Sequence, residues 1–222
     1  MHPAFTSLRR CGVLLATLVA ATAAQASLVS VSSSVTVLGA APANVRQGQL
    51  TSLTNSFLFQ EKAGATLASP LTVNAAAPGT YNTPGSVVSS LTAGTVFDSF
   101  YFHVDAGAFV RSYISVLTFD SDILGLIFRS QELVDSNFLG VPTTLYSTSN
   151  TGNQLFELSA TEFITVSADR RTLTVTNQVN GGLDDMRILT DVAVPVPEPG
   201  SLALVSLALA GVGFSRRIRA RR

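Results

Sequence analysis

The stretch Arg171-Thr172-Leu173-Thr174-Val175-Thr176 indicates the fold class most directly. Leucine and valine alternate with threonine, so an extended backbone would have one apolar face and one hydroxyl-bearing face. Successive side chains of a strand point to opposite faces, and alternation with a period of two is typical of a half-buried β-strand. β-branched residues add to the preference for a strand. The stretch therefore predicts a strand in a sheet with one face in the core.

The same alternation recurs along the chain. It predicts further strands at residues 29–38, 52–60, 65–73, 100–104, 115–119, 162–167, 172–178 and 186–190. Clusters of proline, glycine and asparagine predict loops at residues 40–44, 75–79, 82–85 and 180–182, and residues 168–171 predict a hairpin turn. One short helix is expected within residues 130–139. About nine to eleven short strands favour an all-β fold, a single jelly-roll-like β-sandwich, with an irregular β-barrel as the main alternative.

Charge is unevenly distributed along the chain. All 14 acidic residues but only seven basic ones lie in residues 27–200, which gives this part a net charge of −7. An acidic domain is repelled by phosphate backbones, so nucleic acid is not expected as a partner. The single cysteine, Cys11, precedes this part, and the domain therefore has no disulfide and no thiolate ligand.

The N-terminus has the three parts of a secretory signal peptide. Arg9 and Arg10 are basic, residues 11–23 are apolar, and small residues follow at Ala24 and Ala26. We expect signal peptidase to cut between Ala26 and Ser27, so residues 1–26 are the signal peptide and residues 27–193 the exported domain.

The C-terminal residues 194–222 form a tail of three parts. A proline-rich hinge contains Pro197, Glu198 and Pro199, an apolar segment covers residues 200–214, and an arginine-rich end covers residues 215–222 and includes Arg216 and Arg217. The apolar segment would be about 22 Å long as a helix, which is short for a hydrocarbon core of about 30 Å. Arginines stay on the cytoplasmic side of a membrane. This order predicts a marginal transmembrane anchor with an accessible hinge outside it.

This tail resembles the PEP-CTERM sorting domain of exported bacterial proteins. The resemblance rests on residues 196–201, the apolar segment after them and Arg216-Arg217. It implies recognition and cleavage by an exosortase, a membrane-embedded cysteine protease or transpeptidase-like enzyme. It also implies a diderm bacterium that makes extracellular polysaccharide, with transient anchoring in the inner membrane and then release to, or attachment at, the cell surface or matrix. A membrane anchor with a proline-rich flank and no processing is the alternative.

A second resemblance concerns the domain itself. Residues 97–105, 117–127, 167–173 and 185–190 are similar to an ectodomain that recurs in PEP-CTERM proteins. This resemblance implies no catalytic residues.

Motifs of catalysis are sparse. His103 is the only histidine outside the predicted signal peptide, and Tyr101, His103 and Asp105 are expected on a face of their strand that is not in the core. A hydrolase would have to use His103, but there is no Gly-x-Ser-x-Gly elbow, phosphate-binding loop or dinucleotide-binding glycine pattern. We therefore expect no enzymatic activity and no catalytic or cofactor-binding residues.

Two carboxylates suggest a metal site. Asp120 and Asp122 are two residues apart in an expected loop, and oxygen ligands suit calcium. Asp98, Asp184 and Asp185 are candidates for completing the site. The simpler interpretation is that Asp120 and Asp122 stabilise a turn after a strand.

The expected function is that of a non-enzymatic cell-surface or extracellular-matrix protein processed by an exosortase. The alternative is a carbohydrate-binding module of the exopolysaccharide matrix, with or without calcium. It would use exposed tyrosines for stacking on sugars, although tyrosines in strands are more often packed in the core. The candidates are Tyr81, Tyr101, Tyr113 and Tyr146.

Overall fold

A computed structural model describes residues 28–83, 88–148, 156 and 158–192. The predicted signal peptide, with Ala24, Ala26 and Ser27, lies outside the described residues. So does the sorting tail, with Pro197, Glu198, Pro199, Arg216 and Arg217.

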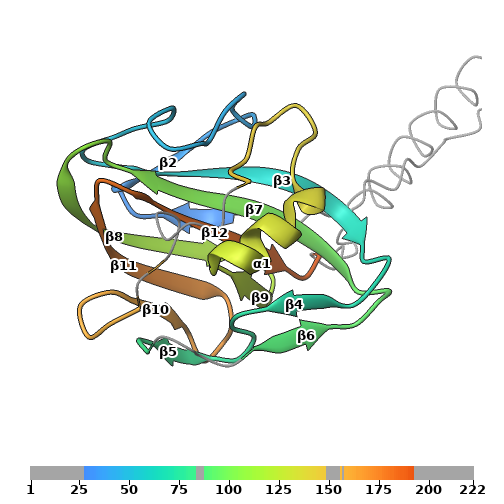
Figure 1. The fold of residues 1–222 in the computed structure, drawn as a ribbon. Coiled ribbons are helices and arrows are strands. Elements are labelled where there is room, and N and C mark those ends of the chain that lie inside the picture. Colours follow the sequence, from blue (N-terminus) through green and yellow to red (C-terminus); the bar gives the residue numbers. More distant parts are fainter. Residues whose placement is uncertain (1–27, 84–87, 149–155, 157, 193–222) are drawn as a thin grey trace, which may run out of the picture.

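Two five-stranded sheets form the body of the fold (Figure 1). Sheet A has the order β1-β8-β11-β10-β5, and all its pairs are antiparallel. Its strands are β1 (Leu28–Val31), β8 (Val110–Phe119), β11 (Thr172–Asn180), β10 (Phe163–Val166) and β5 (Gly79–Tyr81).

Sheet B has the order β2-β3-β7-β12-β9. Its strands are β2 (Val35–Val37), β3 (Ser56–Thr66), β7 (Val96–Asp105), β12 (Leu183–Thr190) and β9 (Ile123–Ile127). The β2–β3 pair is parallel, whereas the other pairs are antiparallel, so the sheet departs from the antiparallel pattern of a jelly roll. A third sheet pairs β4 (Leu71–Val73) with β6 (Ser89–Leu91).

The main core lies between sheets A and B. One continuous cluster joins buried residues of sheet A, such as Leu117, Leu173 and Val175, to residues of sheet B, such as Phe102 and Ile188. These positions follow the alternation of the sequence, because every second side chain of each strand points inward. The described residues are therefore an all-β fold whose two large sheets pack face to face.

A second layer covers the outer face of sheet B. Phe59, Tyr101 and Leu189 from this sheet pack with residues of the covering layer, among them Val45 and Tyr146. This layer also includes helix α1 (Ser130–Asp135) and the 3₁₀ turn η1 (Asn137–Leu139). Strands β7 and β12 are consequently buried on both faces.

The sequence predictions hold best for the regular alternating strands. The strand at residues 172–178, its hairpin partner and the short helix within residues 130–139 are all confirmed. The continuous strand expected at residues 29–38 is wrong: β1 and β2 are separate, because the chain turns after Val31 and passes from sheet A to sheet B. The strands expected at residues 52–60 and 65–73 are also divided differently, since β3 runs without interruption to Thr66 and β4 begins after Pro70.

Candidate functional site

A network of buried polar side chains lies on the outer face of sheet B. The register places Asp185 of β12 opposite His103 of β7, and Arg187 opposite Tyr101. Glu61 joins them from β3. All five side chains are buried beneath the covering layer.

His103 is held between two acceptors. Its Nδ1 lies 2.6 Å from Oδ1 of Asp185, and its Nε2 lies 2.9 Å from the carbonyl oxygen of Leu50. A carboxylate and a carbonyl can only accept, so each of these hydrogen bonds needs a proton on its ring nitrogen, and both form at once only when the ring is an imidazolium. Burial alone lowers the pKa of His103, but the Asp185 carboxylate and the bond to Leu50 outweigh burial and raise the pKa above 6.5.

Asp185 also orders Tyr101. The Tyr101 hydroxyl donates to Oδ2 of Asp185 over 2.8 Å, so the two carboxylate oxygens bind two different strand-neighbour side chains. Burial, followed by the nearby Asp185 charge, raises the pKa of Tyr101 well above 10. Tyr101 is therefore a neutral donor.

Arg187 and Glu61 form a fully buried ion pair. Nε and Nη2 of Arg187 donate to the two carboxylate oxygens of Glu61 over 2.6 and 2.9 Å. The hydroxyl of Ser99 donates to the same carboxylate, and Nη1 of Arg187 donates to the hydroxyl of Ser136. The guanidinium also lies 5.5 Å from the ring centre of Tyr146. Such a two-pronged, hydrogen-bonded pair is the arrangement that offsets the cost of burying two charges.

The expectation that Tyr101, His103 and Asp105 lie outside the core is wrong. All three are buried, because the covering layer seals the face of β7 on which they lie. Asp105 accepts hydrogen bonds from the backbone of Gly48 and Gly107, which fixes two loops. His103 has no free ring nitrogen and no exposed surface, so in this conformation it cannot take a proton from a substrate.

The predicted calcium residues lie at a turn. Asp120 and Asp122 flank the connection from β8 to β9, beside the β10–β11 hairpin. Asp122 lies 3.6 Å from Nε of Arg171 and 4.0 Å from Nε of Arg170. Among the described residues no group of three or more possible metal-ligating side chains occurs. The geometry favours the simpler interpretation, a role in the turn, and calcium binding stays the alternative prediction.

The additional calcium ligands considered from sequence are not brought to Asp122 as a group. Asp184 binds Asn177, and Asp185 belongs to the His103 network at the opposite end of β12 from Thr190. Asp98 is closer along the sheet, but its carboxylate accepts a hydrogen bond from the backbone of Gly64.

Three of the four tyrosines suggested for sugar stacking are buried. Tyr101, Tyr113 and Tyr146 lie in the two cores, so their exposure was predicted wrongly, whereas packing, the commoner case, is observed. Tyr81 is half-buried, and its hydroxyl exchanges hydrogen bonds with the backbone of Ala77.

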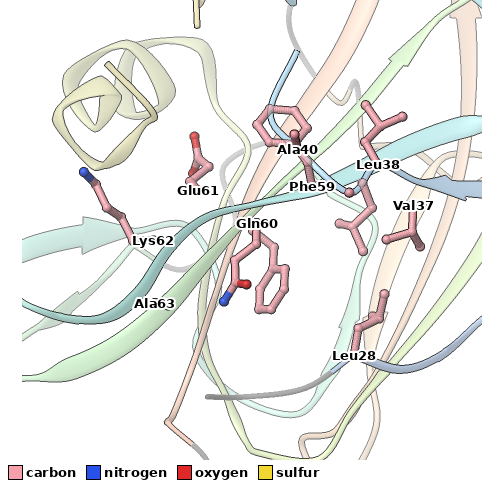
Figure 2. A pocket seen from close by; sticks show the side chains of 12 residues that line it. Leu28, Val37, Leu38, Ala40, Phe59, Gln60, Glu61, Lys62 and Ala63 are labelled. Carbon is pink, nitrogen blue, oxygen red and sulfur yellow. The ribbon is translucent and has the colours of Figure 1, made fainter. Parts of the chain in front are cut away.

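An open cleft of about 540 Å³ lies along the edge of β3 (Figure 2). Strand β2 pairs with β3 only as far as Leu58, and among the described residues no strand extends that pairing towards Thr66. Glu61 points from β3 towards the covering layer, where it meets Arg187, while Gln60 points the other way. Apolar side chains form most of the wall: Leu28, Val37, Leu38, Leu58, Phe59 and Phe100.

The described residues thus form an all-β domain with a sealed polar network, and none of their helices is long and apolar enough to cross a membrane. The tail supplies the more specific finding. Residues 195–217 match the family model of the PEP-CTERM protein-sorting motif, so the chain carries this sorting signal. Such a motif implies export, a membrane-anchored sorting signal and, in general, recognition by an exosortase. Neither a curated protein nor a solved structure matched the chain.

Proposed function

We propose that this protein is a non-enzymatic component of the cell surface or extracellular matrix, cleaved by an exosortase in its C-terminal tail. The match of residues 195–217 to the sorting motif carries the proposal. The sealed environment of His103 agrees with it, because the one histidine outside the predicted signal peptide is committed to holding the fold.

Each part of the tail has a separate task in this proposal. Glu198 provides the charge that the enzyme recognises, and Pro197 and Pro199 keep the backbone extended for its groove. Residues 200–214 hold the substrate in the inner membrane, and Arg216 and Arg217 orient it from the cytoplasm. Signal peptidase and the export machinery act first, at Ala26-Ser27.

Intact-mass measurement of the exported protein tests this function. In a host with an exosortase we expect a C-terminus at or near residues 197–199, and in the same host without the enzyme we expect Arg222 to remain. Glu198→Ala should leave the chain unprocessed, whereas the matched change Glu162→Ala in the folded domain should not. Recovery of an intact tail from the cell surface of the exosortase-positive host would contradict the proposal.

A role in binding carbohydrate is the second candidate. The observation that favours it is an uncharged, threonine-rich sheet face, and not the tyrosines considered from sequence.

A further inference from the structure

The outer face of sheet A is a regular array of uncharged side chains, most of which carry a hydroxyl or a short aliphatic group. In β8 and β11 the inward residues Tyr113, Leu117, Leu173 and Val175 belong to the core, so the residues between them point away from it. The outward residues are Ser30, Thr80, Val110, Ser112, Ile114, Val116, Thr118, Phe163, Thr165, Thr172, Thr174, Thr176, Gln178 and Asn180. Neighbouring outward side chains are about 4.8 Å apart from one strand to the next and about 6.7 Å apart along one strand.

The pairing of the strands fixes the rows of this array. One row runs Thr80, Thr165, Thr174 and Val116, and the next runs Phe163, Thr176 and Ile114. The hydroxyls of Thr80 and Thr165 are 3.0 Å apart, and the amide of Gln178 donates to the hydroxyl of Ser112 over 3.2 Å. Neighbouring side chains therefore already hold one another in place on the sheet.

The absence of charge sets this face apart from the rest of the domain. None of the outward residues of these described strands is charged, although residues 27–200 carry a net charge of −7. On the same face, the aliphatic side chain of Ile114 is 62% exposed. Solvent-facing strands of a soluble protein usually carry charges that prevent association, so a neutral face with exposed aliphatic groups indicates an interaction surface.

We propose that this face binds a neutral polysaccharide that lies flat across the strands of sheet A. Each threonine offers a hydroxyl beside a methyl group, which matches the hydroxyl edges and the C–H faces of sugar rings. Phe163 and Ile114 flank Thr176 and supply apolar contact for a ring face. The net negative charge of the domain repels anionic polymers and therefore favours a neutral one. This binding specifies the second candidate function proposed above, and it does not depend on cleavage of the tail.

A second copy of the chain is the competing occupant. Stable protein interfaces are centred on aromatic anchors in well-packed pockets. This face instead has six threonines and one half-buried aromatic residue, Phe163. Its composition therefore favours the hydroxylated polymer.

Binding of the full chain to three neutral polymers, microcrystalline cellulose, chitin and cross-linked dextran, tests the proposal. We expect retention on at least one of them. Thr174→Glu and Ile114→Glu should each weaken this retention at least about tenfold, because a carboxylate would be desolvated against the sugar. Thr72→Glu and Val88→Glu introduce the same charge at exposed positions away from the face and should leave retention unchanged.

Thermal unfolding and molecular mass are measured for every variant. Equal unfolding temperatures with selective loss of retention support the proposal. No retention of the wild type on any of the three polymers, or equal retention by all variants, overturns it. A wild-type dimer that Ile114→Glu converts to a monomer also overturns it and assigns the face to a second copy. Tail processing is read separately by intact mass, so failure of one proposal leaves the other distinguishable.

Discussion

His103 illustrates how a single side chain links two layers of the molecule. Its ring connects Asp185 in sheet B to the backbone of Leu50 in the covering layer. Both bonds need a proton on the ring, so the link between layers depends on the charge of one residue. Its neighbours on the same face of β7 have other roles: Asp105 accepts hydrogen bonds from backbone N–H groups, and Tyr101 is a neutral donor.

This link predicts a dependence of stability on pH. The pKa of His103 is raised in the folded state relative to about 6.5 in the unfolded chain. Its contribution is therefore complete below about pH 6.5 and is lost as the pH rises through the raised folded-state pKa. Denaturant titrations from pH 5 to 9 should show the free energy of unfolding falling over that upper range.

The variant His103→Gln should remove most of this fall while lowering stability at acidic pH. No other histidine lies outside the predicted signal peptide, so a second imidazole cannot supply the effect. Identical pH profiles for the wild type and His103→Gln would show that the ring is neutral in the folded protein.

The Glu61–Arg187 pair predicts a large effect of removing one partner. Glu61→Leu leaves the Arg187 guanidinium buried without its carboxylate, and we expect a loss of about 3–5 kcal/mol. The double variant Glu61→Leu, Arg187→Met removes both charges and should recover much of that loss. Chemical denaturation measures all three, and double-variant stability below that of Glu61→Leu would contradict the argument.

Gly140 is required by close packing against Tyr146. A Cβ at this position would lie 2.7 Å from Cζ of the Tyr146 ring. This ring is held in place because its hydroxyl accepts a hydrogen bond from the backbone of Val141 and its face lies beside Arg187. Gly140→Ala should therefore destabilise the fold by about 1–3 kcal/mol through overpacking. Gly39→Ala is the matched control, since nothing lies within 4 Å of its Cβ position. Equal melting temperatures for the two variants would contradict this account.

Among the elements, the hairpin between β10 and β11 contacts the turn that joins β8 to β9. Arg170 adopts a positive φ of 60°, and its guanidinium donates to the carbonyl oxygen of Ile123 at the start of β9. Arg170 and Arg171 also place positive charge beside Asp122. The hydrogen bonds from Arg170 to Ile123 therefore tie the hairpin to the start of β9, and the positions beside Asp122 are already occupied by two guanidinium groups.

A calcium titration distinguishes the two interpretations of Asp120 and Asp122. Because Asp122 already faces two guanidinium groups, we expect millimolar calcium to leave the melting temperature unchanged. A rise that chelator reverses, and that Asp120→Asn abolishes while Asp135→Asn does not, would establish the metal site instead.

Strands β7 and β12 show how far alternation predicts an element. Phe100, Phe102 and Val104 point to the main core, as the sequence predicts. The polar side chains between them suggest solvent on the other face, and the structure places the covering layer there. Period-two patterning records which side chains share a face, but the layer that covers that face comes from residues far away in the sequence, such as Tyr146. The sequence around Asp185 and Arg187 looks like that of an exposed charged strand, and nothing near them in the sequence indicates the buried residues with which they pair.

At the scale of the whole molecule, the ends of the chain and its middle were predictable to different degrees. The tail could be identified from sequence alone, because its hinge, apolar segment and arginines follow one another directly along the chain. The all-β class follows from repeated alternation and is confirmed. The pairing of the strands, including the parallel β2–β3 pair, could not be predicted, because long-range register depends on which distant strands bury their apolar faces together.

Charge asymmetry along the chain predicts the orientation of the tail. Changing Arg216 and Arg217 to glutamate reverses the charge next to the apolar segment. We expect unprocessed chain to accumulate, because the arginines no longer fix the orientation of this segment in the membrane. Cell fractionation with intact-mass measurement detects it. Arg111→Glu, on the exposed part of β8, is the control for altered charge alone. Normal processing of the double variant would show that the arginines do not orient the tail.

The position of β12 has a mechanical consequence. The tail follows directly after this strand, which is hydrogen-bonded to β7 on one side and to β9 on the other. A force that pulls on the C-terminal tail would act on the fold at Thr190 and along β12. The hydrogen bonds between β12 and its neighbours are perpendicular to the strand, and therefore perpendicular to this force. Many rungs would then share the load at once, as in shear, and they would not open one after another. A domain attached to the cell through its C-terminus would therefore resist mechanical unfolding by fluid flow.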